Sequence, residues 1–469
     1  MTTSRRQFIG KMGGMAATAG AASMGCSVLS ARKEGRSAKR PLNILLLMTD
    51  QHRYDAMGFM GNENVSTPTL DGIAARGTAF ERAYCQSPVC TASRISMLMG
   101  RYNHSTNVLY HPLPSARHMV SFPQSMRAKG YATGCFGKLH VNGRDDLDWD
   151  VYRSKKDWPK PKVEPGMRIL GGAIIGGDNP LGLPSPLPEE SHWEWNAKEE
   201  TLNFMEENRG NPWFIQCSFG KPHPAFQPPK RHWNTIDRAK IKIPRYPADD
   251  LEDVSPRRWE RMVKQKIDKV TDEDVLDAMQ GYYGNIAFCD ELFGEVLAKL
   301  DELGLRENTL IVFTADHGEM LYSHRLWSKF CFFKESVRVP LIISLPGVVR
   351  SGFKTDALAE LIDLYPTFME LQGFDTPDTV QGKSMVPLLT GATETHKDIV
   401  RSELRDGFAM QFDGRYKIVD NGPELKPELY DHENDPREIN NLAEFPEQRK
   451  RVQRMLRELR KWGQTDLYP

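Results

Sequence analysis

The chain has 469 residues, 39% of them apolar and 26% charged. This composition excludes fibrous and largely disordered proteins, and the length leaves room for a large α/β domain with an appendage. The 62 basic and 62 acidic residues cancel, but residues 1–40 hold eight of the basic ones and one acidic one. Residues 41–469 therefore carry 54 basic and 61 acidic side chains, a net charge of −7. A mildly acidic body lacks the basic surface that nucleic acid requires, so we expect no nucleic-acid partner.

The N-terminal segment has the pattern of an export signal. Arg5 and Arg6 precede an uncharged stretch of small and apolar residues at 12–31. The stretch is too weakly apolar for a stable membrane span, and the paired arginines resemble a twin-arginine signal. We expect residues 1–40 to be an export signal and linker, and the protein to be periplasmic or at the cell surface. A disordered basic tail is the alternative.

Seven cysteines are spread along the chain without a C-x-x-C pair, so neither a zinc ribbon nor a disulfide framework is indicated. Cys26 follows Gly25 as in a lipoprotein cleavage site, which makes a lipid anchor at Cys26 a further interpretation of the N-terminal segment. Cys85 and Cys90 are close enough in sequence to form one disulfide in an oxidising compartment.

Short runs rich in Ile, Val, Leu and Phe predict fully buried parallel strands at residues 43–49, 213–219, 309–314 and 340–345. Helical periodicity predicts helices at 67–76, 120–129 and 275–303. Strands that alternate with helices predict an α/β fold, in which a large and mostly parallel sheet is covered by helices on both faces.

The pattern changes after residue 391. Residues 401–404, 408–412 and 416–419 alternate polar and apolar side chains, and an Asp-Gly pair at 413–414 separates the last two of these runs. This predicts an antiparallel hairpin, followed by an amphipathic helix at 446–462. We therefore expect an α/β catalytic domain at 41–391 and a smaller antiparallel α+β subdomain at 392–469.

Polar side chains follow three of the predicted strands directly. Asp50 and Gln51 follow the first strand, His223 follows the second, and Asp316 and His317 follow the third. Because ligands bind at the carboxyl ends of parallel strands, we expect these side chains to meet. Carboxylates with an amide and an imidazole make an oxygen-rich site suited to Ca²⁺, Mg²⁺ or Mn²⁺. Taken singly, each of these residues could equally be a turn residue.

The run 90–101, CTASRISMLMGR, begins with a cysteine and continues as a helix. Thr91 or Ser93 could cap that helix at its N-terminus. A thiol at a helix N-terminus beside a guanidinium is acidified and reactive, so Cys90 next to Arg94 is a candidate nucleophile.

This run resembles the signature of the type I sulfatases, C-x-(P/A)-S-R followed shortly by G-R, in the alkaline phosphatase superfamily. Further motifs of that family are matched in the family's order. They are GKLH at 137–140, KPH at 221–223, DHGE at 316–319, WSK at 327–329 with SVRVP at 336–340, and LYD, DP and NL between 429 and 442. The resemblance covers residues 42–442 and implies a sulfatase-like sheet with a smaller C-terminal subdomain.

In that family the cysteine is oxidised to formylglycine by a maturation enzyme, and the hydrated aldehyde attacks the sulfate ester. The resemblance implies that Cys90 becomes this nucleophile, which requires a free thiol and disfavours a bridge to Cys85. It also implies that His223 protonates the leaving alcohol, that His140 bonds the hydrated aldehyde, and that Arg94 holds residue 90. Two further cations would stabilise the sulfate oxygens in the transition state, Lys138 and Lys329.

The resemblance further implies a Ca²⁺ ion held by Asp50, Gln51, residue 90, Asp316 and His317. Many family members have Asp where this chain has Gln51, and some have Asn where it has His317. A neutral amide lowers the negative charge of the site and an imidazole suits Mn²⁺, so Mn²⁺ and Mg²⁺ remain alternatives.

The expected substrate is a sulfated carbohydrate, since an exported enzyme meets extracellular sulfated sugars, and loops 151–200 and 224–262 are expected to select it. Two other functions remain open. One is hydrolysis of a phosphonate monoester or phosphodiester, which enzymes of the same superfamily perform. The other is carbohydrate binding without catalysis.

Overall fold

A computed structural model of the chain describes residues 41–106, 108, 120–141, 147–163, 182–246, 256–264, 267–405 and 407–464. The export signal at 1–40 and the lipid anchor at Cys26 lie outside the described residues and stay predictions. Along the described part, no helix is both long and apolar enough to cross a membrane. Residues 41–469 form a single unit by their internal contacts, and the domain boundary at residue 391 also stays a prediction.

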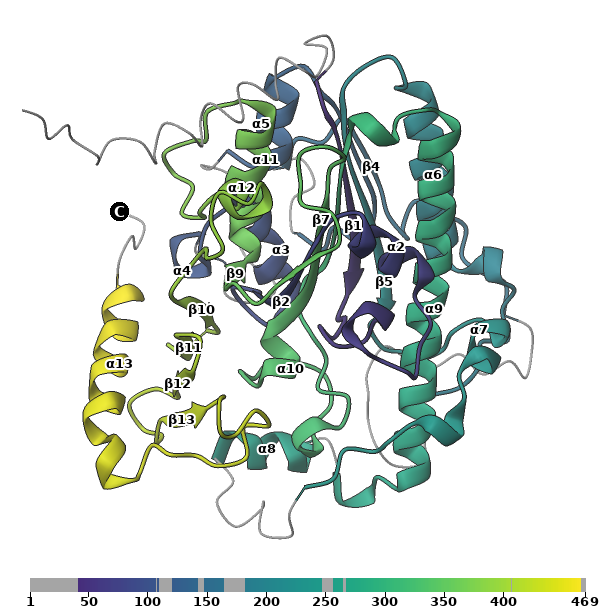
Figure 1. The fold of residues 1–469 in the computed structure, drawn as a ribbon. Coiled ribbons are helices and arrows are strands. Elements are labelled where there is room, and N and C mark those ends of the chain that lie inside the picture. The colour runs from purple at the N-terminus through teal and green to yellow at the C-terminus, as the bar shows by residue number, and fades with distance from the viewer. Residues whose placement is uncertain are drawn as a thin grey trace, which may run out of the picture. The chain divides into compact units, whose positions relative to one another are not determined.

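Within the described residues, nine strands form a mixed, mostly parallel sheet in the order β4-β3-β5-β1-β6-β7-β2-β8, with β9 paired to β2 (Figure 1). Every residue of β1 is buried, because helices cover both faces of the sheet. The strands are β1 Asn43–Asp50, β2 Thr78–Tyr84, β3 Ala132–Gly137, β4 Val151–Arg153, β5 Trp213–Pro222, β6 Thr309–Ala315, β7 Arg338–Ser344, β8 Phe353–Thr355 and β9 Ala359–Glu360.

Three of the four strands predicted as parallel are parallel, and the fourth is not. β1 pairs in parallel with both β5 and β6, whereas β7 runs antiparallel to β6 and to β2. A parallel neighbour needs a crossover connection, usually a long helix. The connection from β6 to β7 contains a single short α-helix, α10 (Lys334–Val337), and returns the chain in the opposite direction. A strand that is buried on both faces has the same apolar run whether it is parallel or antiparallel to its neighbours, so the sequence of β7 does not show its direction.

Helices lie on both faces of the sheet (Figure 1). On one face, α2, α6 and α9 pack against the strands through a core that includes Phe204, Trp213 and Phe293. On the other face, Phe122 contacts Phe214 of β5 and Phe368 with ring centroids 4.8 and 5.0 Å apart. The principal helices are α2 Pro68–Ala75, α3 Cys90–Met99, α5 Phe122–Ala128, α6 Trp193–Glu207, α9 Asp272–Glu302 and α11 Leu364–Gln372. Shorter helices lie in the connections, α4 Asn103–Thr106, α7 Lys230–Thr235, α8 Pro256–Lys264 and α12 Val386–Leu389.

A second, antiparallel sheet follows in the order β10-β11-β12-β13. The predicted hairpin is confirmed, since β11 and β12 pair across Asp413-Gly414 and Gly414 has a φ of +94°. The terminal helix, α13 Arg449–Trp462, packs on this sheet through an apolar cluster that includes Ile418, Leu429 and Met455. The strands are β10 Val400–Glu403, β11 Ala409–Phe412, β12 Tyr416–Asp420 and β13 Glu428–Asp431. The small α+β unit predicted from the alternation is therefore present.

Candidate active site

The carboxyl ends of β1 and β6 bring two carboxylates together. Asp50 is the last residue of β1 and Asp316 follows β6, and both are fully buried. The two strands are parallel neighbours with Thr49 opposite Ala315, so the residues that follow them meet at one edge. The backbone N–H of Gln51 donates to Asp316 Oδ1 at 3.0 Å, as does the N–H of His317. The convergence expected at the strand ends is confirmed for these four residues.

Cys90 is the first residue of α3 and its side chain faces those strand ends. The cap predicted at Thr91 or Ser93 is wrong, because the N-cap residue is Val89 and no side chain caps the helix. Both hydroxyl groups bond instead to neighbouring segments. Thr91 Oγ1 donates to the carbonyl oxygen of His140 at 2.9 Å, and Ser93 Oγ donates to the carbonyl oxygen of Asp316. These bonds fasten the start of α3 to the loops that carry the site.

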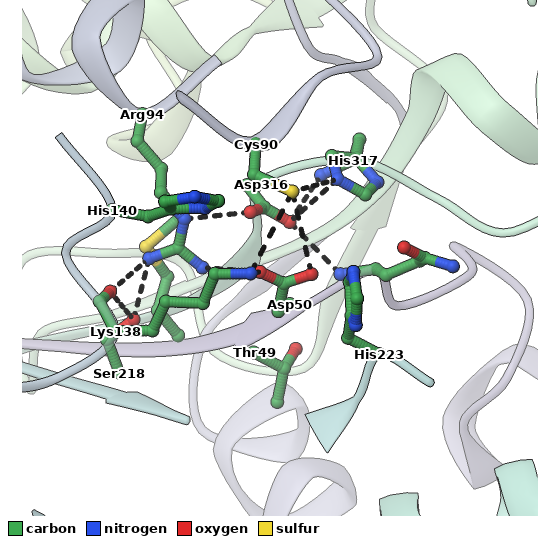
Figure 2. Close-up of polar contacts among 12 residues, drawn as sticks. Thr49, Asp50, Cys90, Arg94, Lys138, His140, Ser218, His223, Asp316 and His317 are labelled. Atoms are coloured by element: carbon green, nitrogen blue, oxygen red, sulfur yellow. Dashed lines mark hydrogen bonds and ion pairs between the residues drawn. The ribbon is translucent and has the colours of Figure 1, made fainter. Parts of the chain in front are cut away.

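Polar groups surround the Cys90 sulfur, among them those of Asp50, Lys138 and His317 (Figure 2), and Cys90 is 3% exposed. His317 Nε2 lies 3.1 Å from Sγ and Asp50 Oδ1 lies 3.9 Å from it. The ammonium groups of Lys329 and Lys138 lie 3.5 and 3.9 Å away. The cysteine has no disulfide, and the other cysteines of the described residues are free as well. The chain thus brings its candidate nucleophile between acids and cations from four separate segments.

Arg94 lies under this cluster and is completely buried. Its Nε donates to Asp316 Oδ2 at 2.7 Å, and one Nη lies 3.4 Å from Asp50 Oδ2. The other Nη donates to Ser218 Oγ at 2.9 Å and to the carbonyl oxygen of Lys138. A guanidinium shared by two carboxylates offsets the cost of burying their charges. The sequence analysis does not identify Ser218 as a site residue. The feature that could have identified it is its position as a polar residue inside the apolar run of β5.

The charges of the site favour binding of an anion. Burial and the neighbouring Cys90 act to raise the pKa of Asp50, but Lys138, His223 and Arg94 outweigh them and hold it below its usual range. Burial acts to lower the pKa of Lys138, and Asp50 reverses this and raises it. Lys138 also forms an ion pair with Asp50 Oδ2. Lys138 and Lys329 lie beside the Cys90 sulfur, so an anion that approaches residue 90 meets two cations.

The donor set also fits a divalent cation. Asp50, Cys90, Asp316 and His317 are all buried, and one donor atom of each lies within 4.8 Å of the others. The Oδ2 atoms of both carboxylates are taken up by Lys138 or Arg94. Asp316 Oδ1 also accepts two backbone N–H groups, so Asp50 Oδ1 is the carboxylate oxygen that faces the Cys90 sulfur and is most open to a metal. Burial acts to lower the pKa of His317, whereas Asp316 acts to raise it and prevails. Two carboxylate oxygens with an imidazole suit Ca²⁺, Mg²⁺ or Mn²⁺ better than a thiolate-rich zinc cage.

Gln51, predicted as a fifth ligand, borders this cluster. Its Oε1 accepts a hydrogen bond from Lys329 Nζ, and its Nε2 donates to the carboxylate of Glu319. The two charged neighbours fix the orientation of the amide, because an ammonium has no lone pair and a carboxylate has no proton to give. Glu319 is held in turn by the N–H of Leu321 at 2.9 Å. Glu319 therefore holds Gln51, and Gln51 holds Lys329 beside Cys90. The sequence does not predict this role of Glu319, and metal binding by Gln51 stays a prediction.

A cavity of about 700 Å³ adjoins the site, with Lys138, His140 and His223 in its lining. His223 follows β5, and its Nδ1 lies 2.8 Å from the carbonyl oxygen of Pro224. Nδ1 therefore donates its proton there in the neutral ring, and Nε2 is left for other partners. Burial, followed by the charge of Lys329, lowers the pKa of His223 to about 3. His140 is exposed in the same cavity, and its bond to the nucleophile stays a prediction.

His192, in the wall of the same cavity, is expected to make the protein less stable in acid. Burial, followed by Lys221 and His232, lowers the pKa of His192 from 6.5 to about 3, and its buried Nε2 has no hydrogen-bond partner among the residues that the structure describes. Below pH 6.5 the unfolded chain binds a proton that the folded protein does not, so stability falls by about 1.4 kcal/mol per pH unit until the folded pKa is reached. His192→Gln should therefore retain about 2.3 kcal/mol more of its unfolding free energy than wild type between pH 6.5 and 4.5, since the unfolded imidazole is already half protonated at pH 6.5. Urea denaturation at the two pH values measures this, and an identical pH dependence in both proteins would contradict it.

Comparison with known proteins agrees with the fold and shows the family. The family model described as Sulfatase matches residues 42–374, and the model described as N-sulphoglucosamine sulphohydrolase, C-terminal, matches residues 322–465. A mixed sheet that carries a buried cysteine, two carboxylates and several cations at its strand ends defines a hydrolase for anionic esters. The chain belongs to the sulfatase family of the alkaline phosphatase superfamily and is a sulfuric ester hydrolase.

Individual relatives cover most of the chain. The choline-sulfatase of Rhizobium meliloti is 28% identical over 428 residues, which are 86% of this chain and 83% of that protein. The ulvan-active sulfatase of Formosa agariphila is 28% identical over 371 residues, 74% of this chain and 65% of that protein. Among solved structures, the phosphonate monoester hydrolase of Silicibacter pomeroyi superimposes with a TM-score of 0.78 at 25% identity and covers 90% of this chain and 95% of that chain.

Proposed function

We propose that the protein removes sulfate from a carbohydrate, with residue 90 as the nucleophile. The observation that supports this most directly is the position of the Cys90 sulfur, which lies 3.9 Å from Asp50 Oδ1 and 3.5 Å from Lys329 Nζ. After oxidation to formylglycine by a maturation enzyme, residue 90 would supply the attacking hydroxyl, and a Ca²⁺ ion held by Asp50, Asp316 and His317 would polarise the sulfate.

The protein's own cations bind and orient the ester. Lys138 and Lys329 approach residue 90 from different segments, so both ammonium groups are placed to contact peripheral sulfate oxygens. Negative charge gathers on those oxygens in the transition state, and cations fixed in advance need no reorganisation to stabilise it. Arg94 contributes by holding both carboxylates and the carbonyl oxygen of Lys138, which orients the loop that carries this lysine.

His223 is proposed as the acid that protonates the leaving alcohol. In the free protein its pKa is about 3, with burial as the first cause and Lys329 as the second, so the ring is neutral at pH 7. A bound sulfate brings negative charge next to the ring and opposes the effect of Lys329. A nearby negative charge raises the pKa of a histidine. Substrate binding is therefore expected to favour protonation of Nε2, which can then donate the proton to the leaving alcohol.

A carbohydrate substrate is supported by the C-terminal family model, which describes an enzyme of sulfated glucosamine, and by the relative that acts on ulvan. The lining of the cavity argues against choline sulfate. Lys138, Lys155, Lys156 and Lys221 lie in that lining, and Glu194 is the acidic residue there among the described residues. A quaternary ammonium in this cavity would be repelled. The predicted export signal also supports an extracellular sugar as the substrate.

The activity test compares three substrates of the matured enzyme, an aryl sulfate, an aryl phosphonate monoester and an aryl phosphodiester. The resemblance to a phosphonate monoester hydrolase makes phosphonate hydrolysis the second candidate. We expect the highest kcat/KM on the aryl sulfate. Aldehyde content at residue 90 must first be measured by mass spectrometry, because an unmatured sample lacks the nucleophile. A higher kcat/KM on the phosphonate would reverse the assignment.

A further inference from the structure

The cavity beside the site carries more positive charge than one sulfate ester needs. We propose that Lys155 and Lys156 bind a second anionic group of the substrate, either a sulfate or a carboxylate, so that the natural substrate is a saccharide with at least two negative groups. This inference rests on the proposed function and specifies the substrate class of the same site.

The strand pairing places these lysines next to the catalytic segment. β4 pairs in parallel with β3, with Arg153 opposite Phe136. Lys138 lies two residues beyond Phe136, and Lys155 lies two residues beyond Arg153. Neighbouring strands are about 4.8 Å apart, so the two lysines leave adjacent strand ends in the same direction. A saccharide whose sulfate ester contacts Lys138 therefore presents its neighbouring substituents to Lys155.

The turn that holds the two lysines leaves their charges exposed. The acid that follows them in the sequence, Asp157, accepts hydrogen bonds from the backbone N–H of Ser154 at 2.7 Å and from its hydroxyl at 3.0 Å. Asp157 therefore closes the turn, and no ion pair joins either lysine to the part of the chain that the structure describes. Two adjacent ammonium groups repel each other, and an anion between them relieves that repulsion.

The acid in the lining does not offset this charge. Glu194 is 1% exposed, and its Oε1 accepts from the backbone N–H of Lys221 at 3.2 Å. Burial raises the pKa of Glu194, which favours its neutral form. Trp193 lies next to it in the lining and adds an apolar surface for the face of a sugar ring. Cations with an aromatic surface suit an anionic saccharide better than a neutral alcohol.

Isothermal titration calorimetry tests the inference without turnover. Saccharide probes are titrated into the full-length Cys90→Ala protein in a buffer that contains Ca²⁺. In each of two pairs of probes, one neutral group of the first member is replaced by an anionic group in the second. N-acetylglucosamine 6-sulfate is compared with glucosamine 2-N,6-O-disulfate for a second sulfate, and glucose 2-sulfate with glucuronic acid 2-sulfate for a carboxylate. We expect at least about tenfold tighter binding of the dianionic member in one pair, as for a charge-assisted contact in a partly exposed cavity. The pair that shows the difference identifies the second group.

The two alanine variants remove the same charge from the same segment, and the arginine variant keeps it. Lys155→Ala/Lys156→Ala should abolish the preference for the dianionic probe, and Lys155→Arg/Lys156→Arg should keep it. Lys160→Ala/Lys162→Ala removes two exposed lysines that lie outside the cavity lining and should leave the preference unchanged. Equal affinities within both pairs, no binding of any probe, or an equal effect of both alanine variants would overturn the inference. Failure of the matured wild type to hydrolyse an aryl sulfate would instead refute the proposed function.

Discussion

Replacement of Cys90 by Ala is expected to lower kcat of the enzyme on an aryl sulfate by roughly ten-thousand-fold or more, because a methyl group cannot become the nucleophile. The fold should survive the change. The thiol is surrounded by His317 Nε2 at 3.1 Å and Lys329 Nζ at 3.5 Å, and loss of a sulfur among polar groups removes little apolar packing. Single-turnover and steady-state assays of samples with equal calcium content measure the effect.

Cys85 supplies the matched control. It is as buried as Cys90 and also free, but its backbone N–H is bound to Val337 and its thiol belongs to the core. Cys85→Ala should lower the unfolding free energy by about 1 kcal/mol and leave kcat almost unchanged. If Cys90→Ala kept more than a few per cent of wild-type kcat, residue 90 could not be the nucleophile.

Arg94→Met is expected to lower the unfolding free energy by about 3–5 kcal/mol, because it leaves two buried carboxylates without their shared cation. Arg94 contacts Asp316 at 2.7 Å and Asp50 at 3.4 Å, with all three side chains 0% exposed. Methionine fills a similar volume, so the loss reports charge more than packing. Activity should fall as well, since the carboxylates and Lys138 lose a common anchor. Chemical denaturation at pH 7 and kcat/KM on an aryl sulfate measure the two effects.

Arg127→Met is the corresponding control. Arg127 forms an ion pair with Asp150 at 2.6 Å, but its side chain is 44% exposed, and solvent screens an exposed ion pair so that it contributes little to stability. The same substitution should therefore have a small effect on stability and none on kcat/KM. Equal losses in the two variants would show that Arg94 acts through packing rather than through the charges of the site.

The sequence was sufficient to predict the strands that carry the site and most of its chemistry. An apolar run identifies a buried strand, and a polar residue at its end identifies a candidate ligand, so the sequence alone predicts that Asp50, His223 and Asp316 converge. Periodicity also predicted α9 and the antiparallel unit after residue 391. These features are local, because the burial and direction of a side chain along one element depend on its own neighbours in the chain.

The tertiary structure decided which segments became neighbours. The direction of β7 depended on the connection before it, and the hydroxyl groups of Thr91 and Ser93 bonded to distant loops instead of capping their own helix. Ser218 accepts a hydrogen bond from Arg94 because the strand order places β5 next to β1. The strand that places Lys155 beside Lys138 has three residues, too few for a period-two pattern. Such contacts join residues far apart in the chain, and a local pattern records how deeply a residue is buried but not which partner it meets.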